Sequence, residues 1–178
     1  MRPFAVPCLT AAQSPVLAVR SAPAFTLPDA AGHRRSLEEF RGRPIAVLFF
    51  CGCTPCRDFA RLWAQAQQNG DFRDGEHASA VVVFGGDRAA ANAFAEQTKL
   101  DLFRTLVLAD PDDSISRKFD VGQCPRVFVL DTAGKVTYSS PEAGKSASRL
   151  PPLVLFSRVL TVWRGVKSIH GTPGKVSP

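Results

Sequence analysis

The 178 residues suit a single domain with a sizeable core, and the hydrophobic fraction of 45% and charged fraction of 21% are typical of a globular protein. The net charge of +6 arises entirely after Glu142, since residues 1–142 carry 16 basic and 16 acidic side chains. This distribution argues against a nucleic-acid-binding core. No apolar run approaches the ~20 residues of a membrane span. The five cysteines are too few for a disulfide scaffold, and their odd number leaves at least one without an intramolecular partner.

The first 23 residues contain four prolines and only short apolar patches, so we expect an irregular N-terminal arm over residues 1–23. Their ends are similar to those of a signal peptide, but the middle is interrupted by polar residues and prolines. The sequence therefore favours a cytoplasmic location over an extracytoplasmic one. Cys8 lies in this arm, and we expect it to be incidental.

The next stretch predicts a strand and a turn over residues 24–32, followed by a short helical turn. Ser36 and Glu39 have the spacing of a capping box, in which each side chain bonds a backbone N–H of the other residue.

An apolar run over residues 45–50 predicts a buried strand, and Cys53-Thr54-Pro55-Cys56 follows three residues later. After it the apolar residues recur at helical spacing, and Pro55 suits the first turn of a helix. Cys53 is thus expected at a helix N-terminus, where the positive end of the helix dipole favours a thiolate. We assign Cys53 as the attacking sulfur and Cys56 as the resolving thiol. Half of a zinc site is the usual alternative for such a pair.

Strands and helices alternate through the rest of the chain, which indicates an α/β sheet with parallel strands. The last apolar stretch, residues 153–163, predicts either a helix that covers the sheet or an amphipathic helix that contacts a membrane surface or a partner. Its apolar face is expected to contain Leu153, Phe156, Leu160 and Trp163. The expected elements are strands at 80–84, 106–108, 126–130 and 135–138, helices at 88–100, 114–119 and 153–163, a linker at 139–152, and a disordered tail from residue 165.

These motifs, from about residue 24 to residue 138, resemble the thioredoxin-like superfamily, and among its members the redoxin and TlpA-like thiol–disulfide oxidoreductases. The resemblance implies a three-layer α/β/α sandwich with a central mixed sheet and an N-terminal hairpin extension. Residues 24–163 would form this domain and residues 164–178 a basic tail. It also implies that Pro125 is the superfamily's cis-proline, whose loop lies beside the Cys-x-x-Cys pair and can bind an extended substrate. A trans proline that opens a strand is the alternative.

The chain departs from that family at several positions. Gly52 stands where a tryptophan usually precedes the nucleophile, and residues 45–50 contain no acid that could accept the proton of the resolving cysteine. Asp58 could serve only if it turned inward. A peroxiredoxin would need Thr or Ser three residues before its reactive cysteine, and Phe50 precedes Cys53 by three, so peroxidase chemistry is not expected.

The sequence therefore predicts a thiol–disulfide oxidoreductase without a cofactor, acting on a protein or small-molecule disulfide and using a thiol electron donor. The direction of the reaction depends on reduction potentials that the sequence does not fix. The alternatives are a thioredoxin-fold binding or adaptor module and a protein that binds zinc, copper or an iron–sulfur cluster through thiolates. Residues 143–178, which carry the excess positive charge, would allow a weak contact with a membrane surface or an anionic partner.

Cys124, directly before Pro125, is the remaining open position. If Pro125 is the cis-proline, Cys124 lies within a few ångströms of Cys53. It would then compete with Cys56 for a disulfide with Cys53, or complete a thiolate cluster with Cys53 and Cys56, which Cys51 would join if its side chain turned inward. The third possibility is a small buried side chain that never meets the site. We expect no stoichiometric metal in the isolated protein.

Overall fold

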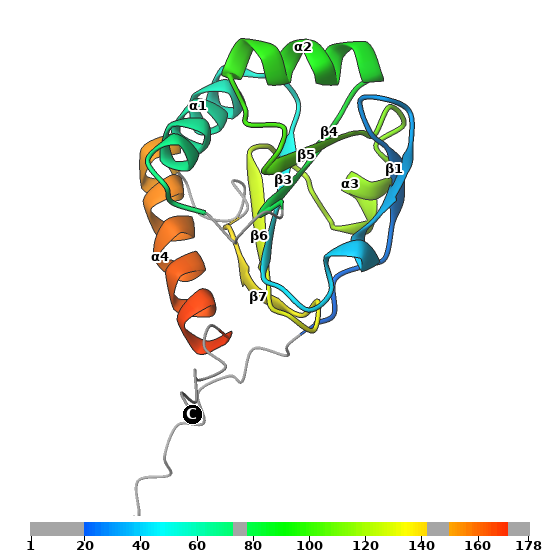
Figure 1. Cartoon of the computed structure of the whole chain (residues 1–178). Coiled ribbons are helices and arrows are strands. Elements are labelled where there is room, and N and C mark those ends of the chain that lie inside the picture. Colours follow the sequence, from blue (N-terminus) through cyan, green and yellow to red (C-terminus); the bar gives the residue numbers. More distant parts are fainter. Residues whose placement is uncertain (1–19, 73–77, 142–149, 171–178) are drawn as a thin grey trace, which may run out of the picture.

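The computed structural model describes residues 20–72, 78–141 and 150–170 (Figure 1). Most of the expected N-terminal arm, including Cys8, and parts of the expected linker and tail lie outside these ranges. The division into arm, domain and tail therefore stays a prediction.

The strand before the Cys-x-x-Cys pair, β3 (Ile45–Phe50), lies at the centre of a five-stranded mixed sheet. Every residue of β3 is buried, as expected for a strand that is covered on both faces. On one side it pairs in parallel with β4 (Ala80–Phe84), which pairs in parallel with β5 (Thr105–Ala109). On the other side it pairs antiparallel with β6 (Arg126–Leu130), which pairs with β7 (Val136–Ser139).

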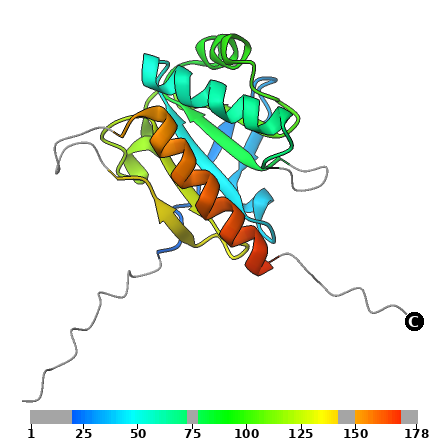
Figure 2. The ribbon, with the colours of Figure 1, turned by 90° about the vertical axis from the view of Figure 1, so that its left-hand side faces the viewer.

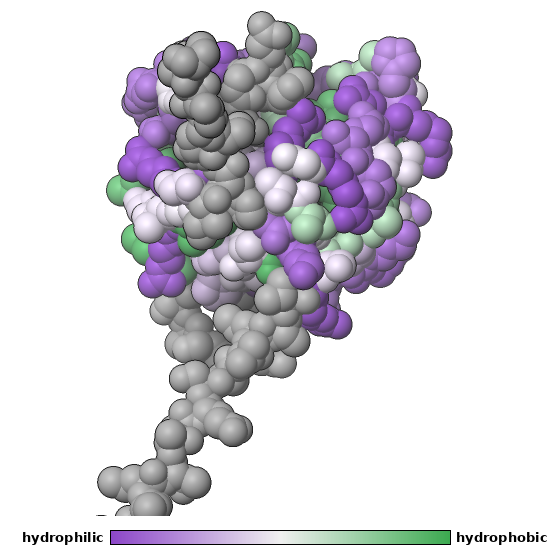
Figure 3. All heavy atoms as spheres, turned by 60° about the horizontal axis from the view of Figure 1, so that its bottom comes forward, coloured by the Kyte–Doolittle hydropathy of each residue, from purple (hydrophilic) through white to green (hydrophobic). Residues whose placement is uncertain are grey.

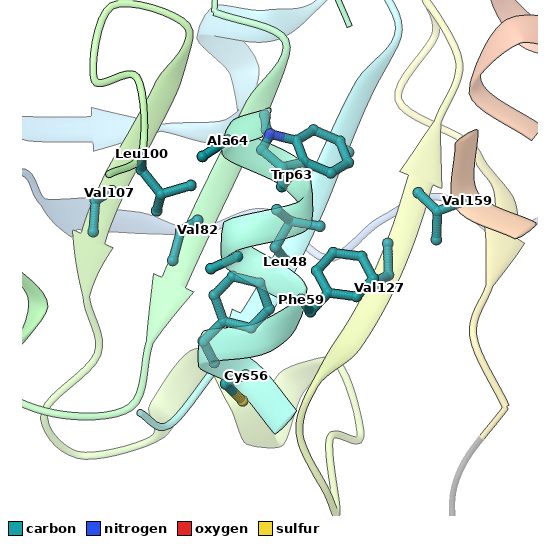
Figure 4. Packing of buried hydrophobic residues seen from close by; sticks show 14 of the residues in the cluster. Leu48, Cys56, Phe59, Trp63, Ala64, Val82, Leu100, Val107, Val127 and Val159 are labelled. Atoms are coloured by element: carbon teal, nitrogen blue, oxygen red, sulfur yellow. The ribbon is translucent and has the colours of Figure 1, made fainter. Parts of the chain in front are cut away.

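Three helices cover one face of this sheet, namely α1 (Thr54–Gln68), α2 (Arg88–Thr98) and α4 (Pro152–His170). Figure 2 shows α1 and α4 side by side across the strands. The helix side chains pack against alternate residues of β3, β4 and β6, because successive side chains of a strand point to opposite faces. Figure 4 shows Phe59 and Trp63 of α1 beside Leu48 of β3, with Cys56 at the start of the same helix.

The opposite face is covered by the β1–β2 hairpin, the short helix η1 and α3. Phe119, the residue directly after α3, contacts the ring of Phe49 on this face. The capping box of Ser36 and Glu39 forms as expected. The bounds are β1 (Thr26–Pro28), β2 (Arg34–Ser36), η1 (Leu37–Phe40) and α3 (Ser114–Lys118). The expected three layers, mixed sheet and hairpin extension are thus confirmed.

The C-terminal helix corrects two details. It continues to His170, so residues 164–170 are helical and do not belong to a disordered tail. Leu153 is 60% exposed; the buried face of α4 contains Leu155, Phe156, Val159, Trp163 and Val166. This face covers the sheet, as the first of the two alternatives predicts.

The outer surface carries no broad apolar area on the side seen in Figure 3, where small hydrophobic areas are scattered among hydrophilic ones. Among the described helices, none has the length and apolar character needed to cross a membrane.

Candidate active site

The Cys-x-x-Cys pair lies where β3 ends and α1 begins. Cys53 is the N-cap residue of α1, and its backbone carbonyl accepts the N–H of Arg57 at 3.0 Å. The Cys53 side chain forms no capping hydrogen bond. Its sulfur is therefore free to react, and it lies next to N–H groups of the first helical turn that have no partner within the helix. Pro55 occupies that first turn, as predicted.

Gly52 explains why the usual tryptophan is absent. Its φ of +77° lies in the left-handed region, where a residue with a Cβ is strained. The turn at Gly52 directs the chain so that the residues on its two sides, Cys51 and Cys53, both carry their sulfurs to the same small volume. A tryptophan in this conformation would be unfavourable.

The loop before β6 brings the fourth cysteine to the site. The peptide bond between Cys124 and Pro125 is cis, which confirms the conformation expected at Pro125. Arg126, the next residue, pairs with Phe49 of β3, so the loop lies beside the end of that strand. Cys124 Sγ consequently lies 4.0 Å from Cys53 Sγ.

The four sulfurs lie within 4.8 Å of one another. Cys51 and Cys124 form a disulfide, with their Cα atoms 6.5 Å apart. The thiols of Cys53 and Cys56 are free, and their sulfurs are 3.3 Å apart. Cys51 is exposed, Cys53 and Cys124 are half-buried, and Cys56 is buried.

Burial has a chemical effect on Cys56. It removes water from the thiolate form and raises the pKa of Cys56 to about 12, from an ordinary value of 9.0. Backbone N–H groups near Cys51 and Gly52 act in the opposite direction but do not compensate for burial. Cys56 is therefore protonated at neutral pH.

The structure answers several of the questions that the sequence left open. Cys124 does meet the site, so the possibility of an isolated small side chain is wrong. Its disulfide partner is Cys51, whereas the sequence suggested competition for Cys53. The Cys51-Gly52-Cys53 sequence was the signal that could have indicated a role for Cys51 in the site, because a glycine between two cysteines permits the turn that places both sulfurs together.

Asp58 does not take the place of the buried acid that β3 lacks. The Asp58 side chain is 48% exposed and forms an ion pair with Arg61 at 3.4 Å, so it does not turn toward Cys56. Among the histidines, His33 is exposed and contacts Asp29 at 3.6 Å, away from the sulfurs. The side chains of the other two are not among those described.

A shallow apolar groove lies directly beside the cis peptide. Prolines supply much of its lining, and prolines offer backbone carbonyls but no N–H groups to a bound chain. The groove is lined by Pro55, Gln123, Cys124, Pro125, Pro141, Leu150, Pro151, Pro152 and Leu155.

Four sulfurs in so small a volume are also a possible metal-ligand set. A tetrahedral zinc site with Zn–S bonds of 2.3 Å places its sulfurs about 3.8 Å apart, close to the spacing of this cluster. Thiolates are the ligands that bind metals, and Cys51 and Cys124 are joined in a disulfide. The set therefore fits a metal only in a fully reduced chain.

The AhpC/TSA family matches residues 19–139. Chloroplastic peroxiredoxin Q of Oryza sativa subsp. japonica is 29% identical over 136 residues, which cover 66% of this chain and 56% of that protein. Chloroplastic peroxiredoxin Q of Gentiana triflora is 30% identical over 132 residues, which cover 64% and 54%. The chain thus spans a little over half the length of these curated relatives.

Two solved structures illustrate the likeness in fold. The thioredoxin domain of a thiol-disulfide oxidoreductase from Bacteroides vulgatus has a TM-score of 0.60 and 25% identity, covering 84% of this chain and 99% of that domain. Peroxidoxin BcpB from Mycobacterium tuberculosis has a TM-score of 0.66 and 20% identity, covering 83% and 96%.

Proposed function

The chain belongs to the AhpC/TSA family, and from this premise we propose that it exchanges disulfides through Cys53 and Cys56. Redoxins of this kind are oxidoreductases that act on thiols and disulfides. One observation carries the finer proposal: the sulfur of the N-cap residue Cys53 lies 3.3 Å from Cys56 Sγ and 4.0 Å from Cys124 Sγ.

The reaction begins with attack by the Cys53 thiolate on one sulfur of a substrate disulfide. A mixed disulfide forms, and the electron pair of the broken bond leaves with the other substrate sulfur. Cys56 then attacks Cys53, closes the Cys53–Cys56 bond and releases the second substrate thiol. Two electrons pass from the chain to the substrate, or in the reverse direction when the partner's potential is lower.

The two cysteines divide these roles because their surroundings differ. Cys53 is partly exposed at the helix N-terminus, where a substrate can reach it. Cys56 is buried and protonated, so it does not compete for the first attack. The proposed role of Pro125 is to form the floor of the groove in which an extended segment of the substrate lies next to Cys53.

We favour disulfide exchange over peroxide reduction, although the curated relatives are named peroxiredoxins. Peroxidases of this family carry a hydroxyl side chain three positions before the reactive cysteine. Here Phe50 stands at that position relative to Cys53, and its side chain is 2% exposed in the core. Cys53 itself holds that position relative to Cys56.

Reduction of a protein disulfide, such as those of insulin, by the chain with dithiothreitol as electron donor tests this proposal. We expect Cys53→Ser to abolish the acceleration, and Cys56→Ser to allow one attack that ends in a stable mixed disulfide. Cys8→Ser is the matched control and should retain the wild-type rate. If Cys53→Ser is as active as wild type, Cys53 is not the nucleophile. If the wild type consumes hydrogen peroxide faster than it reduces disulfides, the family's peroxidase chemistry applies instead.

A further inference from the structure

The Cys51–Cys124 disulfide is a second redox-active centre in contact with the first. We will call Cys51 and Cys124 the outer pair, and Cys53 and Cys56 the inner pair. The outer pair is oxidised while the inner pair is reduced, and the two are separated by only 4.0 Å between Cys53 Sγ and Cys124 Sγ. This distance is close to van der Waals contact between sulfurs, the position from which a thiolate begins its attack on a disulfide.

We propose that the two pairs form an intramolecular relay, in which a disulfide passes between the outer and the inner pair. The inference rests on the proposed function of Cys53 and Cys56 and adds to it a role for Cys51. It means that the chain can hold two disulfides and exchange four electrons, where a lone Cys-x-x-Cys pair exchanges two.

Each step balances without an external reactant. The Cys53 thiolate attacks Cys124 Sγ, the Cys51–Cys124 bond breaks, and its electron pair leaves with Cys51. Cys56 then attacks Cys53 Sγ, the Cys53–Cys124 bond breaks, and its electron pair leaves with Cys124. Two electrons have moved from the inner to the outer pair, and two protons lost by the inner thiols are replaced by two taken up at the outer ones.

Because it is more exposed, the outer pair can react with an external thiol that does not reach the buried sulfur of the inner pair. Cys51 is exposed, whereas Cys56 is fully buried. An external thiol can therefore attack the outer disulfide at Cys51, while the groove beside Pro125 stays available for a substrate of Cys53. The chain would in this way bring electrons in at one sulfur and pass them out at another.

The order of attack follows from the distances and from protonation. Cys53 is the inner sulfur that contacts the outer pair, and Cys56 contacts Cys53. Because Cys56 keeps its proton at neutral pH, the first step belongs to Cys53 and the second step is slower. The intermediate with a Cys53–Cys124 bond should therefore accumulate when Cys56 is replaced.

The test uses the full chain with Cys8→Ser, which leaves only the four cysteines of the site. One sample is prepared fully reduced and receives one equivalent of diamide. A second is prepared fully oxidised and receives one equivalent of a phosphine, so that both samples hold one disulfide per chain. Free thiols are then trapped with N-ethylmaleimide after an acid quench and located by mass spectrometry.

Trypsin separates the products cleanly. Cys51, Cys53 and Cys56 lie on one peptide, residues 42–57, and Cys124 lies on another, residues 119–126. An outer disulfide links these two peptides, whereas an inner disulfide leaves them separate. The relay predicts that both samples reach the same mixture of chains with an outer disulfide and chains with an inner disulfide. The amounts of the two isomers should lie within about tenfold of each other, which corresponds to ~30 mV between the reduction potentials of the outer and the inner pair. In Cys56→Ser, the label should move from Cys53 to Cys51 as the Cys53–Cys124 bond forms.

The inference is overturned if each sample keeps the isomer it started with, or if Cys56→Ser carries the label only at Cys53. Insulin reduction measured on the same samples separates the two proposals: retained activity with no exchange between pairs removes the relay alone, and loss of both removes the proposed function as well. About one zinc or copper ion per chain in protein prepared anaerobically, absent in Cys124→Ala, would replace the relay with a metal site.

Discussion

In the proposed reaction, we expect the buried position of Cys56 to slow the second step, and a change of pH tests this expectation. Since the raised pKa of Cys56 is about 12, about one chain in a hundred thousand holds it as a thiolate at pH 7. With the ordinary value of 9.0, the fraction would be about one in a hundred. A more basic thiolate is a better nucleophile, which recovers about 16- to 32-fold of this thousandfold difference. A net deficit of about 30- to 60-fold remains.

The sign of the pH effect follows directly. Cys56 must lose its proton to attack, so the rate of the second step should rise about tenfold per pH unit from pH 6.5 to 10, with no plateau below a pKa of about 12. The assay is the reaction with Ellman's reagent, which releases one chromophore when Cys53 attacks the disulfide of the reagent and a second when Cys56 attacks the resulting mixed disulfide. The Cys8→Ser background, with Cys51→Ala and Cys124→Ala, restricts the signal to the inner pair. Cys56→Ser should release the first chromophore only.

A plateau of the second phase between pH 8 and 9 would refute this reasoning. It would mean that the thiol is not perturbed by burial, or that a base which the structure does not place beside Cys56 removes its proton. The first phase, measured in the same traces, is the internal control for changes in the reagent.

Three further predictions concern the structure around the site. Trp63→Ala, which removes a fully buried ring stacked on a neighbouring phenylalanine, should lower the free energy of unfolding by about 3–5 kcal/mol in urea titrations; a loss below 1 kcal/mol would contradict its place in the core. Gly52→Ala should lower the free energy of unfolding by about 1–2 kcal/mol because of the left-handed φ of Gly52, and it should make the outer disulfide form more slowly. Gly122→Ala, where no atom of the described residues lies within 4 Å of an added Cβ, should change neither quantity; equal effects of the two substitutions would show that the turn is not strained. Asp110→Ala should cost about 1–3 kcal/mol, since its buried carboxylate accepts backbone N–H groups at the start of α3, and the exposed Asp112→Ala serves as control in the same measurement.

Local patterns in the sequence were sufficient for much of the fold. The unbroken apolar runs at β3 and β4 predict strands buried on both faces, because neither face has a polar residue to offer to water. The capping box at Ser36 and the proline in the first turn of α1 are likewise local, since each depends on backbone groups within a few residues. The position of Cys53 at a helix N-terminus follows from these signals.

The extent of α4 could not be obtained in the same way. Residues 164–170 read as the start of a polar tail, yet Val166 is buried and the helix continues to His170. The turns of this helix are stabilised by packing against α1 and the sheet, which a short window of sequence does not contain.

The partner of Cys124 was decided only by the tertiary structure. From the sequence, Cys51 and Cys124 are 73 residues apart, and nothing local relates them. They meet because β6 pairs antiparallel with β3 in a register that sets Arg126 opposite Phe49, and because Gly52 turns Cys51 toward the loop that begins β6. A cysteine motif thus specifies which sulfurs can react, whereas the strand pairing specifies which of them are close enough to do so.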